Sequence, residues 1–168
     1  MSKNQNLSVL VDTSFLITLY DKERANHSIA LKYFKYFLSN SIKIYLSTIV
    51  ISEFHQGQSI TDIISSGNYI VLPYNFEDAV ETARMAYDLG NVSRKRASRP
   101  ELKDDLKLMG QAVFNDIDFI ITEDESTLAR FCKRLSDSKM YKLKTIIVKD
   151  GFDASYFQGG QSSLLDKD

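Results

Sequence analysis

The sequence predicts an α/β domain in which a central parallel sheet is flanked by helices. Two observations support this fold class. Short β-rich runs alternate along the chain with longer segments whose apolar residues recur at helical spacing. The length of 168 residues and the hydrophobic share of 43% suit one packed core, and no internal repeat or Pro-rich linker divides the chain. We therefore expect a single domain over residues 1–168, with a core from about residue 7 to residue 148 and a polar tail at residues 158–168.

Five runs are expected to form the strands, because each is short and rich in β-branched or aromatic residues. They are Ser8 to Val11, Ile44 to Leu46, Tyr69 to Leu72, Asp118 to Thr122 and Thr145 to Val148. Their regular alternation with helical segments predicts that the strands pair in parallel and that helices cover the sheet.

Two of the intervening segments have clear helical spacing. The first contains Ala30, Tyr33, Phe34, Phe37 and Leu38. The second contains Val80, Ala83 and Tyr87, after the helix-start pattern Asn75-Phe-Glu-Asp. We expect both stripes to pack on the sheet. The aromatic residues around Tyr33 and Tyr36 are also compatible with a surface for a homodimer or an antitoxin.

A third helical segment begins near Pro100, because proline is favoured in the first turn of a helix. One stripe of this helix consists of Leu102, Asp105, Met109 and Ala112. The other, more polar stripe consists of Glu101, Asp104, Leu108 and Gln111. We therefore expect Asp105 to face inward and Asp104 to face outward.

The composition argues against several classes of protein. The apolar runs are far too short to cross a bilayer and the polar opening lacks a signal-peptide pattern, so we expect a cytoplasmic protein with no membrane contact. The single cysteine, Cys132, excludes an internal disulfide, and His27 and His55 are the only histidines, which leaves no zinc site of the usual kinds. No glycine-rich phosphate-binding loop is present. Because the net charge is -1, a nucleic-acid partner requires a local basic patch or a metal ion.

Two acids follow expected strands directly. Asp12 comes after the apolar run that ends at Val11, and Asp124 comes after the run that ends at Thr122. In open α/β sheets, ligands bind in the crevice beyond the carboxyl ends of the strands, so both acids are candidates for a binding site. The alternative is that each acid only caps the next helix, because aspartate is a favoured helix cap.

Two further acids, Glu53 and Asp105, lie on apolar helix faces. Glu53 shares its stripe with Ile49 and Val50, and a carboxylate in such a place needs a basic neighbour, a position at the helix rim, or a cation. If the four acids converge, a cation is required, because two carboxylates about 4 Å apart repel by ~4 kcal/mol at an effective dielectric constant of 20. All-oxygen ligands favour Mg²⁺ or Mn²⁺, which can activate a water for attack on a phosphate.

The only dense basic cluster lies just before Asp105. It consists of Arg94, Lys95, Arg96, Arg99 and Lys103. Two interpretations remain open, namely a surface that contacts RNA and a solvated loop with no partner.

Four short motifs follow one another along the chain. They are Val-Asp12-Thr-Ser14-Phe-Leu, Ser-Glu53-Phe, Asp105-x-x-Leu108-x-Gly110-x-Ala112 and Asp118-Phe-Ile-Ile-Thr122-x-Asp124. Taken together, and over roughly residues 7 to 148, they resemble the PIN-domain family. The resemblance implies a single PIN-like domain that hydrolyses RNA with one or two bound Mg²⁺ or Mn²⁺ ions. Many members of this family are toxins of VapC-like toxin–antitoxin pairs, so an antitoxin protein is an expected partner beside the RNA substrate.

Carried over to this chain, the resemblance assigns the catalytic metal ligands to Asp12, Glu53, Asp105 and Asp124. It assigns supporting roles to the hydroxyl groups of Ser14 and Thr122. The chain departs from the family pattern after Glu53, because the segment Phe-His-Gln-Gly57 lacks the basic residue often found there. The chain is also longer than a compact toxin.

Two other functions remain as alternatives. A PIN-like domain can serve as an adaptor that binds RNA or protein without cleaving, although the presence of all four acids argues against this. An acidic-pocket α/β domain can act in phosphotransfer or signalling, but such a site needs a pair of acids and a lysine at strand ends. Lys149 follows a strand, whereas no adjacent acid pair flanks Asp12.

Overall fold

The computed structural model describes residues 7–54, 59–92, 102–139 and 141–158. Within them, five parallel strands form one sheet in the order β3-β2-β1-β4-β5. The strands are β1 (Ser8–Val11), β2 (Lys43–Ser47), β3 (Ile70–Leu72), β4 (Phe119–Thr122) and β5 (Lys144–Ile147). The predicted fold class is therefore confirmed, and each strand overlaps the run that was predicted to form it.

The two central strands, β1 and β4, are buried along their whole length. Such continuous burial is usual for parallel strands that are covered on both faces. The chain starts in the centre of the sheet, moves outward through β2 to β3, and then returns to the other side of β1 to form β4 and β5. The direction of winding thus changes between β1 and β4, and in open α/β sheets a crevice forms at the carboxyl ends of the strands at such a point.

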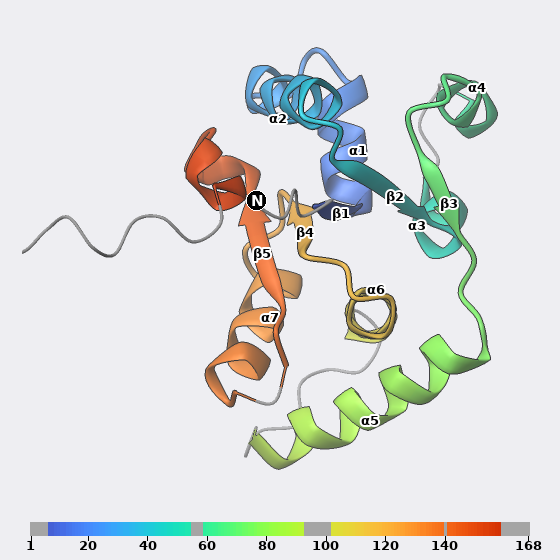
Figure 1. The fold of residues 1–168 in the computed structure, drawn as a ribbon, viewed down its shortest axis with the longest axis vertical. Coiled ribbons are helices and arrows are strands. Elements are labelled where there is room, and N and C mark those ends of the chain that lie inside the picture. The colour runs from blue at the N-terminus through green and yellow to red at the C-terminus, as the bar shows by residue number, and fades with distance from the viewer. Residues whose placement is uncertain (1–6, 55–58, 93–101, 140, 159–168) are drawn as a thin grey trace, which may run out of the picture.

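The helices cover both sides of the sheet (Figure 1). One side carries α1 and α2, and the other carries α5 and α6, with α6 between α5 and the sheet. No helix of the described residues is long and apolar enough to span a membrane. The helices are α1 (Thr13–Tyr20), α2 (His27–Ser39), α3 (Thr48–Glu53), α4 (Ile60–Ser65), α5 (Phe76–Val92), α6 (Leu102–Phe114) and α7 (Leu128–Asp137), followed by the 3-10 turns η1 (Val148–Asp150) and η2 (Ala154–Phe157).

The predicted stripe on α2 is largely confirmed. Ala30, Tyr33 and Phe37 are fully buried, whereas Leu38 at the end of the stripe is 44% exposed. The Tyr33 hydroxyl donates a hydrogen bond of 2.9 Å to the carbonyl of Gly151. The rings of Tyr33 and Phe37 also pack against Phe157 of η2. These aromatic residues therefore belong to the core.

The predicted packing face of α5 is wrong. Val80 is 42% exposed and Tyr87 is 72% exposed, and Ala83 is exposed as well. The opposite face is the buried one, with Met85 and Leu89 in the core. Helical spacing identifies a stripe, but it does not tell which of two stripes on one helix meets the rest of the protein.

The polar stripe predicted for α6 is also buried in part. Leu108 is 1% exposed and Gln111 is fully buried, because α5 covers the side of α6 that faces away from the sheet. A Cβ atom at Gly110 would lie 2.3 Å from Thr82 Oγ1 and 2.9 Å from Thr82 Cα. Glycine at this position of the third motif therefore allows α5 and α6 to approach each other closely.

Candidate functional site

The first two candidate acids lie at the carboxyl ends of the central strands. Asp12 follows β1 directly, and Asp124 comes two residues after the end of β4. The backbone N–H of Asp12 donates a hydrogen bond of 3.0 Å to the carbonyl of Ile121, which joins the ends of the two strands. The structure thus places both acids at the carboxyl edge of the sheet, where ligands bind in open α/β folds.

Asp12 is 7% exposed and occupies the N-cap position of α1, but its side chain makes no capping hydrogen bond. Its Oδ2 atom accepts hydrogen bonds from Ser14 Oγ at 2.6 Å and from Thr122 Oγ1 at 2.8 Å. No ion pair to Asp12 occurs among the described residues. The helix-cap alternative therefore fails for this side chain.

Ser14 and Thr122 also connect the two strand ends. Their hydroxyl oxygens lie 3.0 Å apart. Ser14 Oγ accepts a hydrogen bond of 2.9 Å from the backbone N–H of Glu123, and Thr122 Oγ1 accepts one of 2.9 Å from the backbone N–H of Asp124. The orientation of Asp12 is therefore coupled to the backbone that carries Asp124.

Asp124 has a different environment. Its Oδ1 atom accepts hydrogen bonds from the backbone N–H and the hydroxyl of Ser126, both at 2.7 Å, and its Oδ2 atom accepts one from the Thr127 hydroxyl. Burial raises the pKa of Asp124, but these hydrogen bonds outweigh burial and hold the pKa below its usual value. Asp124 thus remains ionised and stabilises the turn before α7, whereas the N-cap position of α7 is occupied by Thr127.

Glu53 is the last residue of α3 and lies at the rim of the helix, half-buried. Its Oε2 atom accepts a hydrogen bond of 2.5 Å from the Thr13 hydroxyl. Burial is the main cause that raises the pKa of Glu53, and the hydrogen bond from the Thr13 hydroxyl opposes this rise. A hydrogen bond with Asp104 and the charges of Asp104 and Asp12 raise the pKa of Glu53 further.

Asp105 on α6 has a strongly raised pKa. Burial is the main cause that raises its pKa to about 6, the Thr127 hydroxyl acts in the opposite direction, and the charges of Asp12, Asp124 and Glu53 add to the rise. The Oδ2 atom of Asp105 is buried and accepts no hydrogen bond from any described residue. Since all three other candidates act electrostatically on Asp105, the structure brings the four predicted acids into one neighbourhood.

A fifth acid, Asp104, was expected to face outward but also reaches Glu53. Its side chain is 45% exposed, and its Oδ1 atom lies 2.6 Å from Lys107 Nζ. The contact with Glu53 depends on the packing of α3 against α6, which local spacing in the sequence does not reveal. The Thr13 and Thr127 hydroxyls were missed for the same reason, although both belong to the short segments that follow the strand-end acids.

The side chain of Glu123, between Thr122 and Asp124, contacts Thr18 of α1 and Arg24. Its Oε2 atom accepts a hydrogen bond of 2.5 Å from the Thr18 hydroxyl and lies 3.9 Å from Arg24 Nη1. Burial raises the pKa of Glu123, but hydrogen bonds and the charges of Arg24 and Lys149 outweigh burial and lower the pKa.

The donor set fits a hard divalent cation in chemistry, because it consists of carboxylate oxygens with a buried, unpaired Oδ2 on Asp105. Within the described ranges, however, no three acidic, histidine or cysteine side chains are grouped closely enough to hold one ion. The carboxylates of Asp12, Glu53 and Asp124 are engaged with hydroxyl groups instead. Metal binding at the four acids therefore stays a prediction.

Other residues considered in the sequence lie outside the described residues or in other places. The basic residues Arg94, Lys95, Arg96 and Arg99, together with His55, lie outside the described residues, and the side chain of Lys103 is not described either. His27 Nδ1 lies 3.1 Å from the carbonyl of Thr18, a local contact. Cys132 is buried, and burial raises the pKa of its thiol to about 12, as expected for a structural cysteine.

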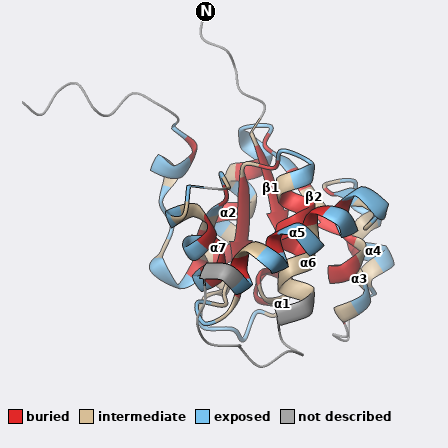
Figure 2. Ribbon diagram, turned by 90° about the horizontal axis from the view of Figure 1, so that it is seen from below, coloured by how far each residue is buried: buried red, intermediate tan, exposed pale blue. Residues whose placement is uncertain are grey.

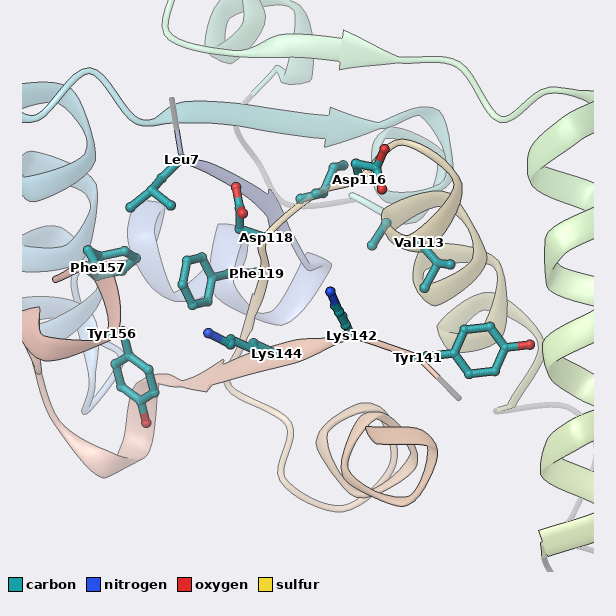
Figure 3. Close-up of a pocket in the computed structure, with 12 residues that line it drawn as sticks. Leu7, Val113, Asp116, Asp118, Phe119, Tyr141, Lys142, Lys144, Tyr156 and Phe157 are labelled. Atoms are coloured by element: carbon teal, nitrogen blue, oxygen red, sulfur yellow. The ribbon is translucent and has the colours of Figure 1, made fainter. Parts of the chain in front are cut away.

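A cavity of about 530 Å³ lies at the opposite edge of the sheet, next to the amino ends of β4 and β5 (Figure 3). Lys142 and Lys144 line it, together with the rings of Phe119 and Tyr156. None of the four candidate acids belongs to this cavity.

Comparisons with known proteins establish the fold of this chain and not its function. No protein-family model and no curated protein matches the sequence. A solved structure of VapBC2 from Rickettsia felis, bound to promoter DNA, is similar with a TM-score of 0.58 at 13% identity, over 83% of this chain and 98% of that chain. The structure of VapBC-1 from nontypeable Haemophilus influenzae is similar with a TM-score of 0.55 at 17% identity, over 85% of this chain and 99% of that chain.

A third similar structure is VapC20 from Mycobacterium tuberculosis, a toxin that cleaves the sarcin-ricin loop. It gives a TM-score of 0.50 at 16% identity, over 73% of this chain and 94% of that chain. These identities are low, but the alignments cover most of both chains, and this chain's described residues form a five-stranded parallel sheet. The chain therefore has the PIN-domain fold of the VapC toxins.

Proposed function

We propose that this protein is an endoribonuclease that hydrolyses RNA phosphodiester bonds with Mg²⁺ or Mn²⁺. The observation that carries the proposal is the buried, unpaired Oδ2 atom of Asp105 in the field of Asp12, Glu53 and Asp124. A buried carboxylate oxygen without a partner is costly, and a bound cation removes both this cost and the repulsion among the acids.

In this proposal, Asp12, Glu53, Asp105 and Asp124 hold the ion, which lowers the pKa of a bound water and stabilises charge on the phosphate. The protein contributes the positions of its carboxylates. Ser14 and Thr122 fix Asp12 by two hydrogen bonds, and the Thr13 hydroxyl holds Glu53 at the end of α3. The excess negative charge of the site makes a cation necessary before an anionic phosphate can approach.

Three cationic side chains of the described residues flank the acids and are suited to contact RNA phosphates. Lys107 is paired with Asp104 and interacts electrostatically with Glu53, and Arg24 and Lys149 act on Glu123, next to Asp124. The side chains of Lys107, Arg24 and Lys149 are 38%, 46% and 49% exposed. Exposed ion pairs contribute only about 0–1 kcal/mol, so RNA phosphates can compete for these cations.

The similar structures include VapBC complexes, and we extend the proposal to an antitoxin partner that neutralises this chain in the cytoplasm. In a cell, such a toxin would stop growth when produced alone, and a co-produced antitoxin would restore it. Growth that is unaffected by the chain alone, in a host whose RNA the purified protein cleaves, would contradict the toxin role and leave the nuclease proposal intact.

The nuclease proposal is tested with purified protein and labelled single-stranded RNA. We expect cleavage with Mg²⁺ or Mn²⁺, none with EDTA, and products with a 5′-phosphate and a 3′-hydroxyl. Asp12→Asn should be inactive, whereas the matched Asp116→Asn at the exposed amino edge should cleave like wild type. Cleavage that survives chelation, or that is equal in both variants, would refute the proposal, and RNA binding without cleavage would favour an adaptor.

A further inference from the structure

Thr127 occupies the N-cap position of α7 but does not cap the helix with its side chain. Threonine is favoured at this position because its hydroxyl oxygen can accept a hydrogen bond from a backbone N–H of the first turn. An N-cap residue usually has an extended backbone, whereas Thr127 has φ -113° and ψ -75°. The carbonyl of Thr127 nevertheless accepts a hydrogen bond of 3.0 Å from the backbone N–H of Phe131, so the helix begins normally. The Thr127 hydroxyl is therefore available for another contact.

This hydroxyl contacts two of the four candidate acids. It donates a hydrogen bond to Asp124 Oδ2, and a hydrogen bond between Thr127 and Asp105 opposes the rise of the Asp105 pKa. Because the Oδ2 atom of Asp105 has no partner among the described residues, the contact with Thr127 involves the other oxygen, Oδ1. Asp124 follows β4 and Asp105 belongs to α6, so one hydroxyl joins acids from two different elements.

The two acids depend on the Thr127 hydroxyl to different degrees. Without it, Asp124 keeps hydrogen bonds from the backbone N–H and the hydroxyl of Ser126, both at 2.7 Å, and one from the backbone N–H of Thr127. For the side chain of Asp105, in contrast, Thr127 is the one hydrogen-bond partner found in the described part of the chain. Loss of the hydroxyl would therefore leave Asp124 in place and release Asp105 from it.

The packing of α7 holds the hydroxyl in a fixed position. Leu128, Phe131 and Cys132 are buried, and Figure 2 shows buried residues of α7 beside the buried strands. The threonine side chain is branched at Cβ, which restricts its rotation about χ1. A hydroxyl carries a single hydrogen, so it cannot neutralise two carboxylates, but it can set the distance between them. This distance decides whether both carboxylates can coordinate the same ion.

We propose, on the basis of the metal site proposed above, that Thr127 is a positioning residue that sets the spacing of Asp105 and Asp124 for a small divalent cation. Mg²⁺ requires a nearly ideal octahedral geometry with ligand distances of about 2.0–2.1 Å, whereas Ca²⁺ accepts longer distances and irregular geometry. A fixed spacing of two ligands should therefore favour Mg²⁺ over Ca²⁺. A purely structural role in α7 would leave this selectivity unchanged.

Four variants test this role of Thr127. Thr127→Val removes the hydroxyl and keeps the branched shape, whereas Thr127→Ser keeps the hydroxyl. Ser126→Ala removes a hydroxyl bond to Asp124 alone, and Ser138→Ala is the matched control that removes one at the other end of α7. Calorimetric titration measures the affinity for Mn²⁺, and competition with Mn²⁺ measures the affinities for Mg²⁺ and Ca²⁺. Thermal melts in EDTA measure the stability of each variant.

We expect Thr127→Val to bind Mg²⁺ about 10-fold or more weakly than wild type, as is usual when a group that supports a metal ligand is lost, with a smaller loss for Ca²⁺. Thr127→Ser should restore the wild-type affinities. Ser126→Ala should lose less than Thr127→Val and should keep the ratio of the two affinities, and Ser138→Ala should bind like wild type. All four variants should melt close to wild type in EDTA, because the Thr127 hydroxyl does not cap α7.

Three results would overturn the role of Thr127 and leave the metal site intact, provided that wild type binds Mn²⁺. They are a Thr127→Val protein with wild-type Mg²⁺ affinity, one that binds Mg²⁺ and Ca²⁺ equally more weakly, and one that melts far below wild type in EDTA, which would give the hydroxyl a structural role. A wild type that binds no Mn²⁺ would overturn both the role of Thr127 and the proposed metal site.

Discussion

Asp12 and Asp118 lie at opposite ends of the same two central strands, and serine hydroxyls hold both. Asp118 Oδ2, at the amino ends, accepts hydrogen bonds from the backbone N–H and the hydroxyl of Ser8, both at 2.8 Å. Asp12 Oδ2, at the carboxyl ends, accepts hydrogen bonds from the hydroxyls of Ser14 at 2.6 Å and Thr122 at 2.8 Å. Hydrogen bonding alone therefore does not distinguish a structural acid from a candidate metal ligand.

The difference lies in the charges around each acid. At the amino edge, Asp118 lines the same cavity as Lys142 and Lys144. At the carboxyl edge, the neighbours of Asp12 include other carboxylates, and their charges contribute to the raised pKa of Asp105. We therefore expect a cation to be required at the carboxyl edge, where several acids converge, and not at the amino edge, where Asp118 lies near lysines.

The largest expected contrast between the two edges comes from their serine residues. Ser14→Ala removes one hydrogen bond to Asp12, and loss of such a supporting contact usually reduces metal affinity or activity by about 10–100-fold. Ser8→Ala removes the equivalent support of Asp118 and should cost about 1 kcal/mol of stability without a change in Mn²⁺ affinity. Calorimetric titration with Mn²⁺ and RNA cleavage rates measure both. Equal changes in metal affinity would show that the two edges do not differ in function.

The second contrast is the dependence of stability on pH in the absence of metal. Because the folded protein raises the pKa of Asp105 from 3.8 to about 6, it binds more protons than the unfolded chain in this window. The contribution of Asp105 therefore lowers stability as pH rises from about 4 to about 6, and Asp105→Asn should remove this decline and melt higher than wild type at neutral pH.

Thermal melts across this range in EDTA check the prediction for Asp105, with Asp116→Asn as the control. The control should follow the wild-type profile. If Asp105→Asn follows the wild-type profile as well, folding does not raise the pKa of Asp105.

The smallest contrast concerns two lysines at opposite ends of β5. Lys149 follows the carboxyl end and acts on Glu123, whereas Lys144 begins the strand at the amino edge. Each lost phosphate contact changes the slope of log affinity against log salt by about 0.7 for single-stranded RNA, so Lys149→Ser should flatten the slope by this amount and Lys144→Ser should not. Fluorescence anisotropy with Ca²⁺ in place of Mg²⁺ measures the slope. Equal slopes in the two variants would show that Lys149 does not contact RNA phosphates.

The sheet and the strand-end acids were predictable from the sequence. Buried parallel strands give short apolar runs, and the carboxyl ends of neighbouring parallel strands meet at one edge, which places Asp12 near Asp124. The packing face of α5 was predicted wrongly. Val80 and Tyr87 have the spacing of a stripe that packs on the sheet, but both are exposed. The spacing of apolar residues along a helix does not show which of its faces packs against the rest of the protein.

The contacts around Glu53 were not predictable for a related reason. Thr13 and Asp104 reach Glu53 only because α1, α3 and α6 pack together in the folded chain. The sequence places Asp104 and Asp105 on adjacent stripes of one helix, and spacing assigned only Asp105 to the site. The basic residues at 94–99 lie outside the described residues, so their predicted contact with RNA stays a prediction.

The most direct test of the central claim, that the four acids form one site for a divalent cation, is the effect of Mn²⁺ on thermal stability. A ligand that binds only the folded state stabilises it by about 2.7 kcal/mol at a concentration of 100 times Kd. We predict that wild type melts at a higher temperature with Mn²⁺ than in EDTA. Asp12→Asn should lose most of this shift, and in EDTA it should melt at the same temperature as wild type or higher, because one repelling charge is gone. An Asp12→Asn protein that keeps the full Mn²⁺-induced shift, or a wild type that shows none, would contradict the claim.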